Sequence, residues 1–363
     1  MLHWVLTLLG MAENNYLESL TIEGYKSIAK QTIEFGRINM LIGANGSGKS
    51  NLLSVLKFIQ VLGDNKLESY VRSEGGADEI LHFGIKNTKV LKIKAKVIGL
   101  EWDITLLPTV NDTFSVTGML NNYKGTKDEK GIIESKELKN VIDILDSANG
   151  EFRYLITYHL NDTSPEASTK MTCNTGDFDY LRENGANLAA FLLYSEKWHP
   201  ASFKRILYTI QLALPFIGDL KVSPTDREGN YTQLRWEHKD KNKTYYASAL
   251  SDGALRFIFM ATLLLQPTPP PILIIDEPEL GLHPSAIGVL ASMIKVASEK
   301  SQILIATQSP QLLDYFEPED ILVAERENEA TIYKRLNKED LSTWLADYSL
   351  SELWDMNIFG GRP

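Results

Sequence analysis

The sequence predicts an α/β protein with a mostly parallel sheet and an antiparallel group of strands near its N-terminus. The strongest observation is a glycine-rich loop between an apolar run, residues 38–42, and an amphipathic helix at residues 51–62. Strand-like and helix-like apolar segments alternate again between residues 250 and 309, which is typical of parallel strands covered on both faces. Residues 17–42 alternate in hydrophobicity, as strands with one solvated face do.

The composition is that of an ordinary globular protein, with 363 residues, 44% hydrophobic and 23% charged. A chain of this length can bury a sizeable core. Its formal net charge of −10 excludes a polycation that coats nucleic acid over its whole surface, although a local basic strip remains compatible with it. The single cysteine, Cys173, excludes an intrachain disulfide and a cysteine-based zinc site, so we expect a cytoplasmic protein.

The first ten residues, MLHWVLTLLG, are apolar, but they lack a basic region and are too short to span a membrane. We therefore expect neither a signal peptide nor a membrane anchor. Met11 is the expected natural start, or the first ten residues are a frayed tail. No other stretch approaches the ~20 uninterrupted apolar residues that a membrane span requires.

We expect four parts along the chain. The predicted elements of the N-terminal lobe are three strands up to residue 42, the helix and a β-hairpin at residues 89–107, with a polar, glycine-containing stretch at residues 70–84 between the helix and the hairpin. The middle of the chain has loop-like stretches, including residues 126–140, and a helical stretch from residue 187 to residue 214. The four parts are a tail (1–15), an N-terminal lobe (16–108), an inserted α+β or helical subdomain (109–245) and a C-terminal lobe (246–363).

The glycine-rich loop, GANGSGKS, fits the pattern G-x-x-x-x-G-K-[ST] in a strand, loop and helix context. Backbone N–H groups of such a loop converge at the start of the helix, where the helix dipole favours an anion. We expect Lys49 to reach the β- and γ-phosphates of a nucleotide and the Ser50 hydroxyl to ligate Mg²⁺. The residues predicted to bind the nucleotide here are Gly43, Ala44, Asn45, Gly46, Ser47, Gly48, Lys49, Ser50 and Asn51.

Two adjacent acidic residues, Asp276 and Glu277, follow a four-residue apolar run. Acids after a buried strand are costly unless they have partners or a chemical role. We predict that Asp276 holds Mg²⁺ through water and that Glu277 polarises the attacking water as general base. Strand ends are often acidic, so the acidic pair alone is a weak indication of a catalytic site. It becomes a strong indication when the glycine-rich loop is present in the same chain.

The stretch SDG, residues 251–253, precedes an apolar helix 25 residues before Asp276. Ser251 and Asp252 suit a plain helix N-cap, which is the better interpretation for an isolated SDG. The alternative is that Ser251, Asp252 and Gly253 bind a γ-phosphate. The distance to the acidic pair favours this second role.

Together these features resemble the ABC ATPase superfamily, in the branch of structural-maintenance, recombination-repair and overcoming-lysogenization-defect ATPases. That resemblance implies ATP and Mg²⁺ as cofactors and an ABC-type ATPase head. It also implies a head-to-tail homodimer in which Ser251 and Gly253 of one subunit close on the ATP held by Lys49 of the other. The resembling stretches are ESLTIEGYKSI and GRINMLIGANGSGKSNLL for the N-terminal lobe, LSDGALRF for the signature motif and PELGLHP for the D-loop.

One departure concerns the switch residue after the next predicted strand. Where this branch commonly has histidine, the sequence reads ATQSP with Gln308. Glutamine can hydrogen-bond a γ-phosphate or orient water but does not change charge, so slow or gated hydrolysis is expected. The alternative is an ordinary polar loop residue.

The Q-loop, which links the lobes in this superfamily, has no secure counterpart in the sequence. His82 stands where the Q-loop residue could lie, but a lone histidine in such a setting is more often structural.

Two further groups have alternative interpretations. Lys92, Lys94 and Lys96 share one face of a predicted strand, where a solvated face is favoured over a strip that tracks the phosphates of DNA or RNA. The aromatic residues of the C-terminal tail either pack in a core, which is favoured, or form a docking patch. These residues are Trp344, Trp354 and Phe359.

The predicted function is a Mg²⁺-dependent ATPase whose dimer closes on ATP and opens after hydrolysis. Closure would be coupled to DNA or RNA, or to a partner effector such as a nuclease or toxin, with phage defence as the first hypothesis. Because the sequence ends soon after the predicted ATPase core, we expect no Toprim nuclease domain of the kind that longer relatives carry. The alternatives are an ATP-binding scaffold with negligible hydrolysis and a recombination-repair DNA-binding ATPase.

Overall fold

The computed structural model divides the chain into two compact units. The first unit combines residues 1–156 with residues 316–363, and the second is formed by residues 157–315. This division does not coincide with the predicted boundaries at residues 108 and 245, which remain a prediction. The predicted tail and most of the predicted loop at residues 126–140 lie outside the described residues. The described residues are 17–64, 66–97, 100–121, 133–135, 155–160, 162–164 and 166–362.

An antiparallel sheet forms one part of the first unit, in the strand order β2-β1-β4-β5-β6-β7. Its strands alternate as the sequence predicts; in β4, residues Leu91, Ile93, Ala95 and Val97 are buried and the lysines between them are not. The predicted N-terminal strands and the hairpin are therefore confirmed. The strands are β1 (Leu17–Tyr25), β2 (Ile28–Glu34), β4 (Leu91–Val97), β5 (Leu100–Pro108), β6 (Phe114–Asn121) and β7 (Ile133–Ser135).

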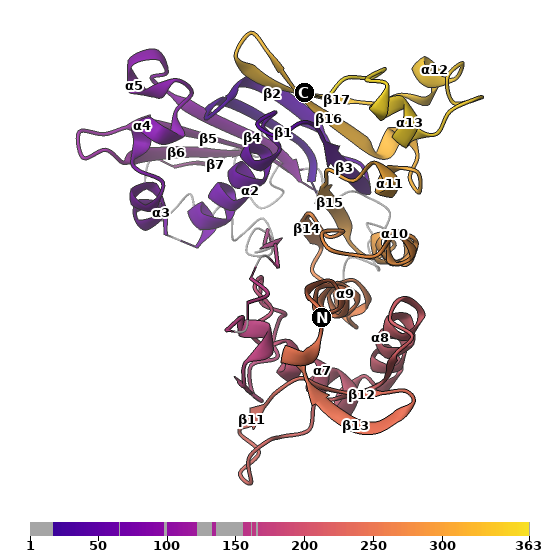
Figure 1. The fold of residues 1–363 in the computed structure, drawn as a ribbon. Coiled ribbons are helices and arrows are strands. Elements are labelled where there is room, and N and C mark those ends of the chain that lie inside the picture. Colours follow the sequence, from indigo (N-terminus) through magenta and orange to yellow (C-terminus); the bar gives the residue numbers. More distant parts are fainter. Residues whose placement is uncertain are drawn as a thin grey trace. The chain divides into compact units, whose positions relative to one another are not determined.

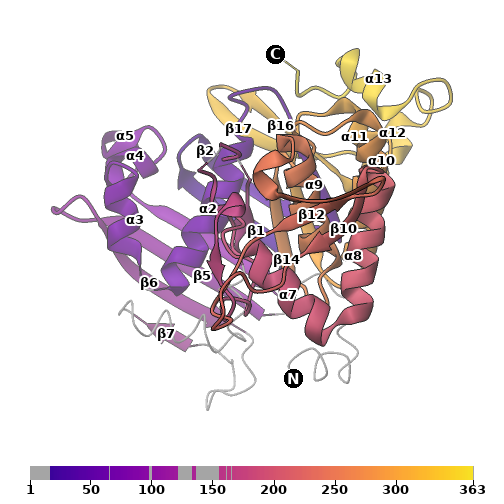
Figure 2. The same cartoon turned by 60° about the horizontal axis from the view of Figure 1, so that its bottom comes forward.

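Helices cover one face of this sheet (Figures 1 and 2). Phe58 of α2 packs against Tyr25 of β1 and Phe114 of β6, with ring centroids 5.8 and 6.4 Å apart. The polar, glycine-containing stretch at residues 70–84, to which the sequence analysis assigned no element, contains helical turns. These turns are too short to show a helical period, and Gly75 and Gly76 separate them. The helices are α2 (Lys49–Gly63), α3 (Leu67–Ser73), α4 (Ala77–Ile80) and α5 (Gly84–Asn87).

Strand β3 (Ile38–Ile42), which leads into the glycine-rich loop, is buried along its whole length. It pairs in parallel with β16 (Ile321–Glu327), which in turn pairs antiparallel with β17 (Ala330–Arg335). Two strands from near the end of the sequence therefore extend the sheet on one side of the strand that carries the loop, with β16 next to β3 and β17 beyond β16. After them come the short helices α12 (Lys338–Leu341) and α13 (Leu350–Asp355).

The second unit contains a parallel group of strands, in which β14 pairs with both β8 and β15. The predicted buried strands before the acidic pair and before Gln308 are thus confirmed. The elements of this part are β8 (Thr157–Tyr158), η3 (Ser168–Lys170), η4 (Ala247–Ala249), α9 (Asp252–Leu265), β14 (Ile272–Asp276), α10 (Pro284–Ser298), β15 (Gln302–Ala306) and α11 (Pro310–Leu313).

The helical stretch expected from residue 187 onwards is two helices, α7 (Leu188–Trp198) and α8 (Pro200–Ala213). Pro200 begins the second helix, because proline lacks an N–H and suits a first helical position. Small antiparallel sheets accompany these helices: β9 (Cys173–Asn174) with β11 (Tyr231–Thr232), and β10 (Ile217–Lys221) with β12 (Arg235–His238) and β13 (Lys241–Tyr246). Within the described part of the chain, every helix is too short or too polar to cross a membrane.

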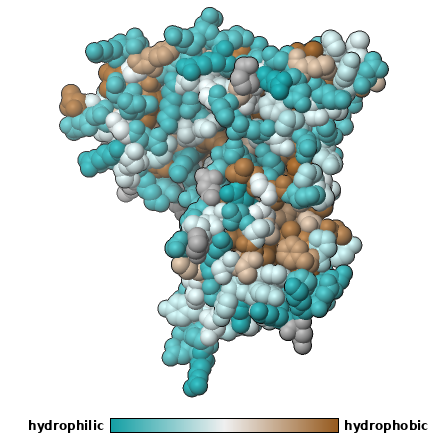
Figure 3. Space-filling view, viewed as in Figure 1, coloured by the Kyte–Doolittle hydropathy of each residue, from teal (hydrophilic) through white to brown (hydrophobic). Residues whose placement is uncertain are grey.

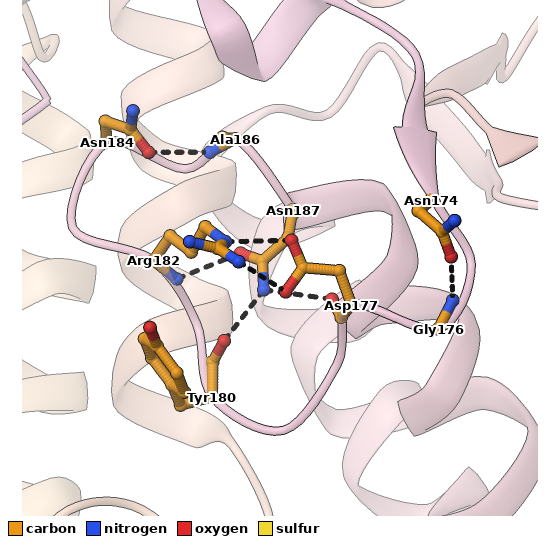
Figure 4. Close-up of polar contacts among 8 residues, drawn as sticks. All are labelled: Asn174, Gly176, Asp177, Tyr180, Arg182, Asn184, Ala186 and Asn187. Atoms are coloured by element: carbon orange, nitrogen blue, oxygen red, sulfur yellow. Dashed lines mark hydrogen bonds and ion pairs between the residues drawn. The ribbon is translucent and has the colours of Figure 1, made fainter.

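A buried amide organises the loop before α7 (Figure 4). Asn187 is fully buried; its Oδ1 accepts a bond from the backbone N–H of Arg182 (2.9 Å), and its Nδ2 donates to the carbonyls of Asp177 and Tyr180 (3.0 and 2.7 Å). The Arg182 guanidinium also pairs with the Asp177 carboxylate, at 2.8 Å. One side chain thus satisfies three backbone groups of a loop that has no sheet partner for them.

Replacing this amide should cost stability. Asn187→Ala leaves three backbone groups without their partner, and we expect the free energy of unfolding to fall by about 2–3 kcal/mol. Urea denaturation followed by circular dichroism measures the change. Asn184→Ala is the matched control, because Asn184 bonds only the exposed N–H of Ala186 in this loop, and it should change the free energy by less than about 0.5 kcal/mol. Equal effects of the two variants would contradict this role of Asn187.

Candidate functional site

The glycine-rich loop of the first unit has a backbone that requires glycine. Gly43, Gly46 and Gly48 have φ angles of 153°, 78° and 110°, which L side chains adopt with strain. A Cβ at Gly48 would lie 2.2 Å from Oγ1 of Thr331, and one at Gly43 would lie 2.4 Å from the carbonyl oxygen of Ala324. Backbone conformation and close packing thus both explain the spacing of the motif.

The polar groups of this loop form a cradle for an anion. The Lys49 ammonium lies back on the loop and donates to the carbonyls of Gly43 (2.5 Å) and Ala44 (3.0 Å). The hydroxyl of Ser47 is buried and has no hydrogen-bond partner among the described residues. The loop also ends at the N-terminus of α2, which has no side-chain cap, and the dipole of such a helix end attracts negative charge. A buried ammonium, an unpartnered hydroxyl and a helix N-terminus fit a phosphate group.

The other residues of the predicted nucleotide-binding set lie in the same loop and in the first turn of α2. Asn45, Gly46 and Ser50 are exposed. Asn51, in contrast, turns its side-chain amide away to donate to the hydroxyl of Ser27, at 2.5 Å. The Ser50 hydroxyl is therefore accessible to a metal ion. The Asn51 side chain, in contrast, is hydrogen-bonded within the protein and not directed towards a ligand.

In the second unit, Asp276 ends β14 and lies beside a histidine that the sequence analysis did not single out. Tyr158 of β8 is in register with Ile275, so His159 comes opposite Asp276. The Nδ1 of His159 is 3.1 Å from the carbonyl oxygen of Asp276 and 3.3 Å from its Oδ2. The sequence signal was weak, a histidine directly after the strand-like residues 155–158.

Glu277 and Gln308, predicted as general base and switch residue, are in direct contact. The Gln308 Nε2 donates to Oε1 of Glu277 at 2.6 Å. Glu277 has a φ of 47°, uncommon for a residue with a side chain, and its N–H donates to the carbonyl of Ala306 at 2.8 Å. Strained backbone of this kind is concentrated at functional sites.

A second acid, Glu279, connects the loop that follows β14 with the loop that follows β15 and carries Gln308. Its Oε1 accepts bonds from the Thr307 hydroxyl (2.5 Å) and from the N–H of Gln308 (3.3 Å), whereas its Oε2 is buried without a partner among the described residues. Burial raises the pKa of the Glu279 carboxyl, and the hydrogen bond from Thr307 partly opposes this rise. Glu279 therefore helps to fix the loop that carries Gln308, a role that sequence reasoning missed.

The predicted signature residues lie at the start of α9. Ser251 is the N-cap, and its hydroxyl accepts a bond from the N–H of Ala254 at 3.3 Å. A Cβ at Gly253 would lie 2.0 Å from the carbonyl oxygen of Gly281 in the PELGLHP stretch. Ser251 therefore caps the helix, and close packing explains the glycine at position 253. The binding of a γ-phosphate by Ser251, Asp252 and Gly253 stays a prediction.

The structure also helps to choose between the two interpretations of the lysine-bearing strand and of His82. Two lysines of β4 are paired with carboxylates, Lys94 with Asp103 (2.7 Å) and Lys96 with Glu18 (2.6 Å), as expected for a solvated face. His82 bonds the Lys26 carbonyl through Nδ1 at 2.6 Å, in agreement with a structural role.

The aromatic residues of the C-terminal tail divide between the two interpretations. Trp354 is 7% exposed and packs in the core, whereas Trp344 is 42% exposed. Phe359 is intermediate. Core packing is therefore confirmed for Trp354 and does not apply to Trp344.

Two family models match overlapping stretches of the chain. Residues 16–187 match the model described as "AAA ATPase domain". Residues 142–314 match the model described as "AAA domain, putative AbiEii toxin, Type IV TA system". The first match contains the glycine-rich loop, and the second contains the acidic pair and Gln308.

Curated relatives include chromosome partition proteins Smc. The protein of Halothermothrix orenii is 30% identical over 146 residues, and that of Bacillus subtilis is 29% identical over 145 residues. Each match covers 39% of this chain and 12% of the relative. The chain therefore corresponds to a small part of these relatives.

Solved structures with a similar fold are heads of Smc proteins. The SmcHead bound to the C-winged helix domain of ScpA has a TM-score of 0.60 at 17% identity and covers 90% of this chain and 99% of its own. The Smc head domain with an extended coiled coil, bound to the C-terminal domain of ScpA derived from Pyrococcus furiosus, has a TM-score of 0.57 at 15% identity, covering 92% and 99%. These structures confirm the predicted fold class, an ABC-type ATPase head with antiparallel and mostly parallel sheets.

The fold is that of an ABC-type ATPase head, and the glycine-rich loop lies at the start of a helix within it. The family models and the curated relatives support the resemblance of this chain to the ABC/SMC-like ATPases. The resemblance inferred from the motifs is thereby confirmed.

Proposed function

We propose that this chain binds ATP at residues 43–51 and hydrolyses it with Mg²⁺ as cofactor. The observation that supports this most directly is the loop itself. Its buried Lys49 ammonium, its unpartnered Ser47 hydroxyl and the N-terminus of α2 together make an anion cradle. The ABC/SMC-like family of the chain supports a nucleoside triphosphate as the anion.

Different residues of the chain would bind the phosphates, hold the metal ion and activate the attacking water. On binding, Lys49 exchanges its carbonyl partners for β- and γ-phosphate oxygens. The Ser50 hydroxyl would ligate Mg²⁺ and the Asp276 carboxylate would hold it through water, since oxygen donors suit this ion. The ion would supply positive charge that neutralises the phosphates. His159 orients the Asp276 carboxylate through its Nδ1 contact. The Glu277 carboxylate accepts the proton of the attacking water, and Gln308 holds that carboxylate in place.

A homodimer is part of the proposal, with Ser251, Asp252 and Gly253 of one copy completing the site of the other. The position of these residues at the first turn of α9, a helix 14 residues long, supports an anion-binding role. The dimer itself is carried over from the family resemblance.

We further propose a partner effector, a nuclease or toxin, in phage defence and in the cytoplasm. The description of the family that matches residues 142–314 supports a toxin-related system. The surface of the second unit supports a protein partner: hydrophobic residues gather over α8 and α9 (Figure 3), and Tyr208 and Leu212 of α8 are 62% and 55% exposed. Coupling to DNA or RNA, as in a recombination-repair ATPase, is less well supported because Lys94 and Lys96 are ion-paired.

A second candidate function is an ATP-binding switch with negligible hydrolysis. The bond from Gln308 to Glu277 favours it, because the amide engages one of the two carboxylate oxygens that would accept the proton of the attacking water. A single assay separates the two functions. Phosphate release from ATP is measured with Mg²⁺ and after its removal by EDTA, beside a binding titration. Metal-dependent release supports the ATPase, binding without release supports the switch, and the absence of both contradicts the proposal.

A further inference from the structure

We propose that Thr331 and Tyr333, on β17, are positioning residues that hold the phosphate-binding loop in its anion-binding shape. The inference rests on the proposed nucleotide binding at residues 43–51 and adds residues that no motif contains. Both side chains are buried, with exposures of 2% and 4%. The Thr331 Oγ1 donates to the carbonyl of Ser47 at 2.9 Å, and the Tyr333 hydroxyl donates to the carbonyl of Gly48 at 2.8 Å.

These two bonds control the direction of the N–H groups on the opposite side of the loop. A trans peptide unit is planar, with its C=O and its N–H pointing in opposite directions. Because Thr331 fixes the carbonyl of Ser47, the N–H of Gly48 in the same peptide unit must point away from β17. The bond from Tyr333 to Gly48 fixes the N–H of Lys49 in the same way. The clamp therefore orients two of the N–H groups that a phosphate would need.

The Thr331 bond carries more of this effect than the Tyr333 bond. The carbonyl of Gly48 also accepts bonds from the N–H groups of Asn51 and Leu52 within the first turn of α2, at 3.0 and 3.3 Å. Its direction is thus held by the helix as well. For the carbonyl of Ser47, which lies before the helix, Thr331 is the side-chain donor that fixes the direction.

A chain of hydroxyl groups fixes the orientation of Thr331 in turn. Asn51 Nδ2 donates to Ser27 Oγ at 2.5 Å, and Ser27 Oγ lies 2.6 Å from Thr331 Oγ1. A carbonyl cannot donate, so the single proton of Thr331 goes to Ser47, and Ser27 must donate to Thr331. This gives one consistent order of donors, from Asn51 through Ser27 and Thr331 to the carbonyl of Ser47. It also explains why the Asn51 amide faces away from the anion cradle.

The space around Thr331 reinforces the clamp. A Cβ at Gly48 would lie 2.2 Å from the Thr331 Oγ1 and 2.6 Å from its Cγ2. The loop is therefore pressed against β17 on the face opposite the anion cradle. Removal of the hydroxyl alone, without loss of the methyl group, isolates the hydrogen bond from this packing.

The test compares Thr331→Val, which keeps the shape but loses the hydroxyl, with Thr331→Ser, which keeps the hydroxyl. Affinity for ATP is measured by equilibrium titration, and the thermal unfolding midpoint is measured beside it. We expect Thr331→Val to weaken ATP binding about tenfold, the effect of about one lost hydrogen bond, and Thr331→Ser to recover most of the affinity. Tyr333→Phe should weaken binding by about threefold, since the helix still holds Gly48.

Thr21→Val is the matched control, because it removes a hydroxyl that bonds Thr32 on the exposed face of the antiparallel sheet. It should leave the ATP affinity unchanged. Should Thr331→Val not fold, Ser27→Ala removes the next donor in the chain and should weaken binding by about threefold. Wild-type affinity in all folded clamp variants overturns the inference. Failure of the wild-type chain to bind ATP instead overturns the proposed function, so the two failures are distinguishable.

Discussion

Glu277→Gln is expected to lower the rate of phosphate release from ATP by about 10²- to 10³-fold, the usual loss when a general base is removed. The amide has the same shape as the carboxyl and can still accept the bond from Gln308 Nε2, but it cannot take a proton from water. The loop at residues 43–51 is unchanged in this variant. ATP affinity should therefore stay within about threefold of the wild-type value.

Release of inorganic phosphate under saturating ATP and Mg²⁺ measures this effect, with a binding titration on the same preparation. Glu196→Gln, on the exposed side of α7, makes the same chemical change on the same unit and should leave the rate unaltered. A Glu277→Gln protein that releases phosphate at the wild-type rate means that Glu277 is not the general base. A rate that falls together with affinity points instead to a disturbed fold around the left-handed backbone of Glu277.

Lys49→Ala is expected to weaken ATP binding by about 10- to 100-fold, the loss of one or two charge-assisted hydrogen bonds. The Lys49 ammonium lies on the carbonyls of Gly43 and Ala44, close to where phosphate oxygens would bind. Without it, the loop keeps its N–H groups but loses its positive charge. Phosphate release should fall with the affinity.

A fluorescent ATP analogue displaced by unlabelled ATP gives the affinity of each protein. Lys57→Ala is the control, because Lys57 is an exposed lysine on the same helix, α2, and its loss removes one charge without touching the loop. It should bind ATP as the wild type does. Equal binding by Lys49→Ala and Lys57→Ala would falsify the assignment of Lys49.

The geometry of the glycine-rich loop could be predicted from sequence because the residues that determine it are close together in the chain. Three glycines with positive φ, a lysine and the start of a helix lie within eight residues, so their spacing alone indicates the geometry. The same holds for Asp276 and Glu277, which follow a recognisable buried strand. Strands β1, β2 and the β4–β5 hairpin were predictable for a similar reason, since their alternation reflects one buried face.

The supporting residues could not be predicted, because their partners are distant in sequence. Thr331 and Tyr333 contact residues 284 and 285 positions away, and His159 contacts Asp276 across 117 positions. No local pattern marks a hydroxyl that will bond a carbonyl at such a separation. Only the pairing of strands, β17 with β16 and β8 with β14, brings these groups together.

The most direct test of the central claim, that the loop at residues 43–51 binds the triphosphate of ATP, is a competition titration on the wild-type chain. A bound fluorescent ATP analogue is challenged with ATP, inorganic tripolyphosphate or adenosine at fixed salt. The account predicts displacement by ATP and tripolyphosphate and much weaker displacement by adenosine. Displacement by adenosine as strong as that by ATP, or no binding of the analogue, would contradict it.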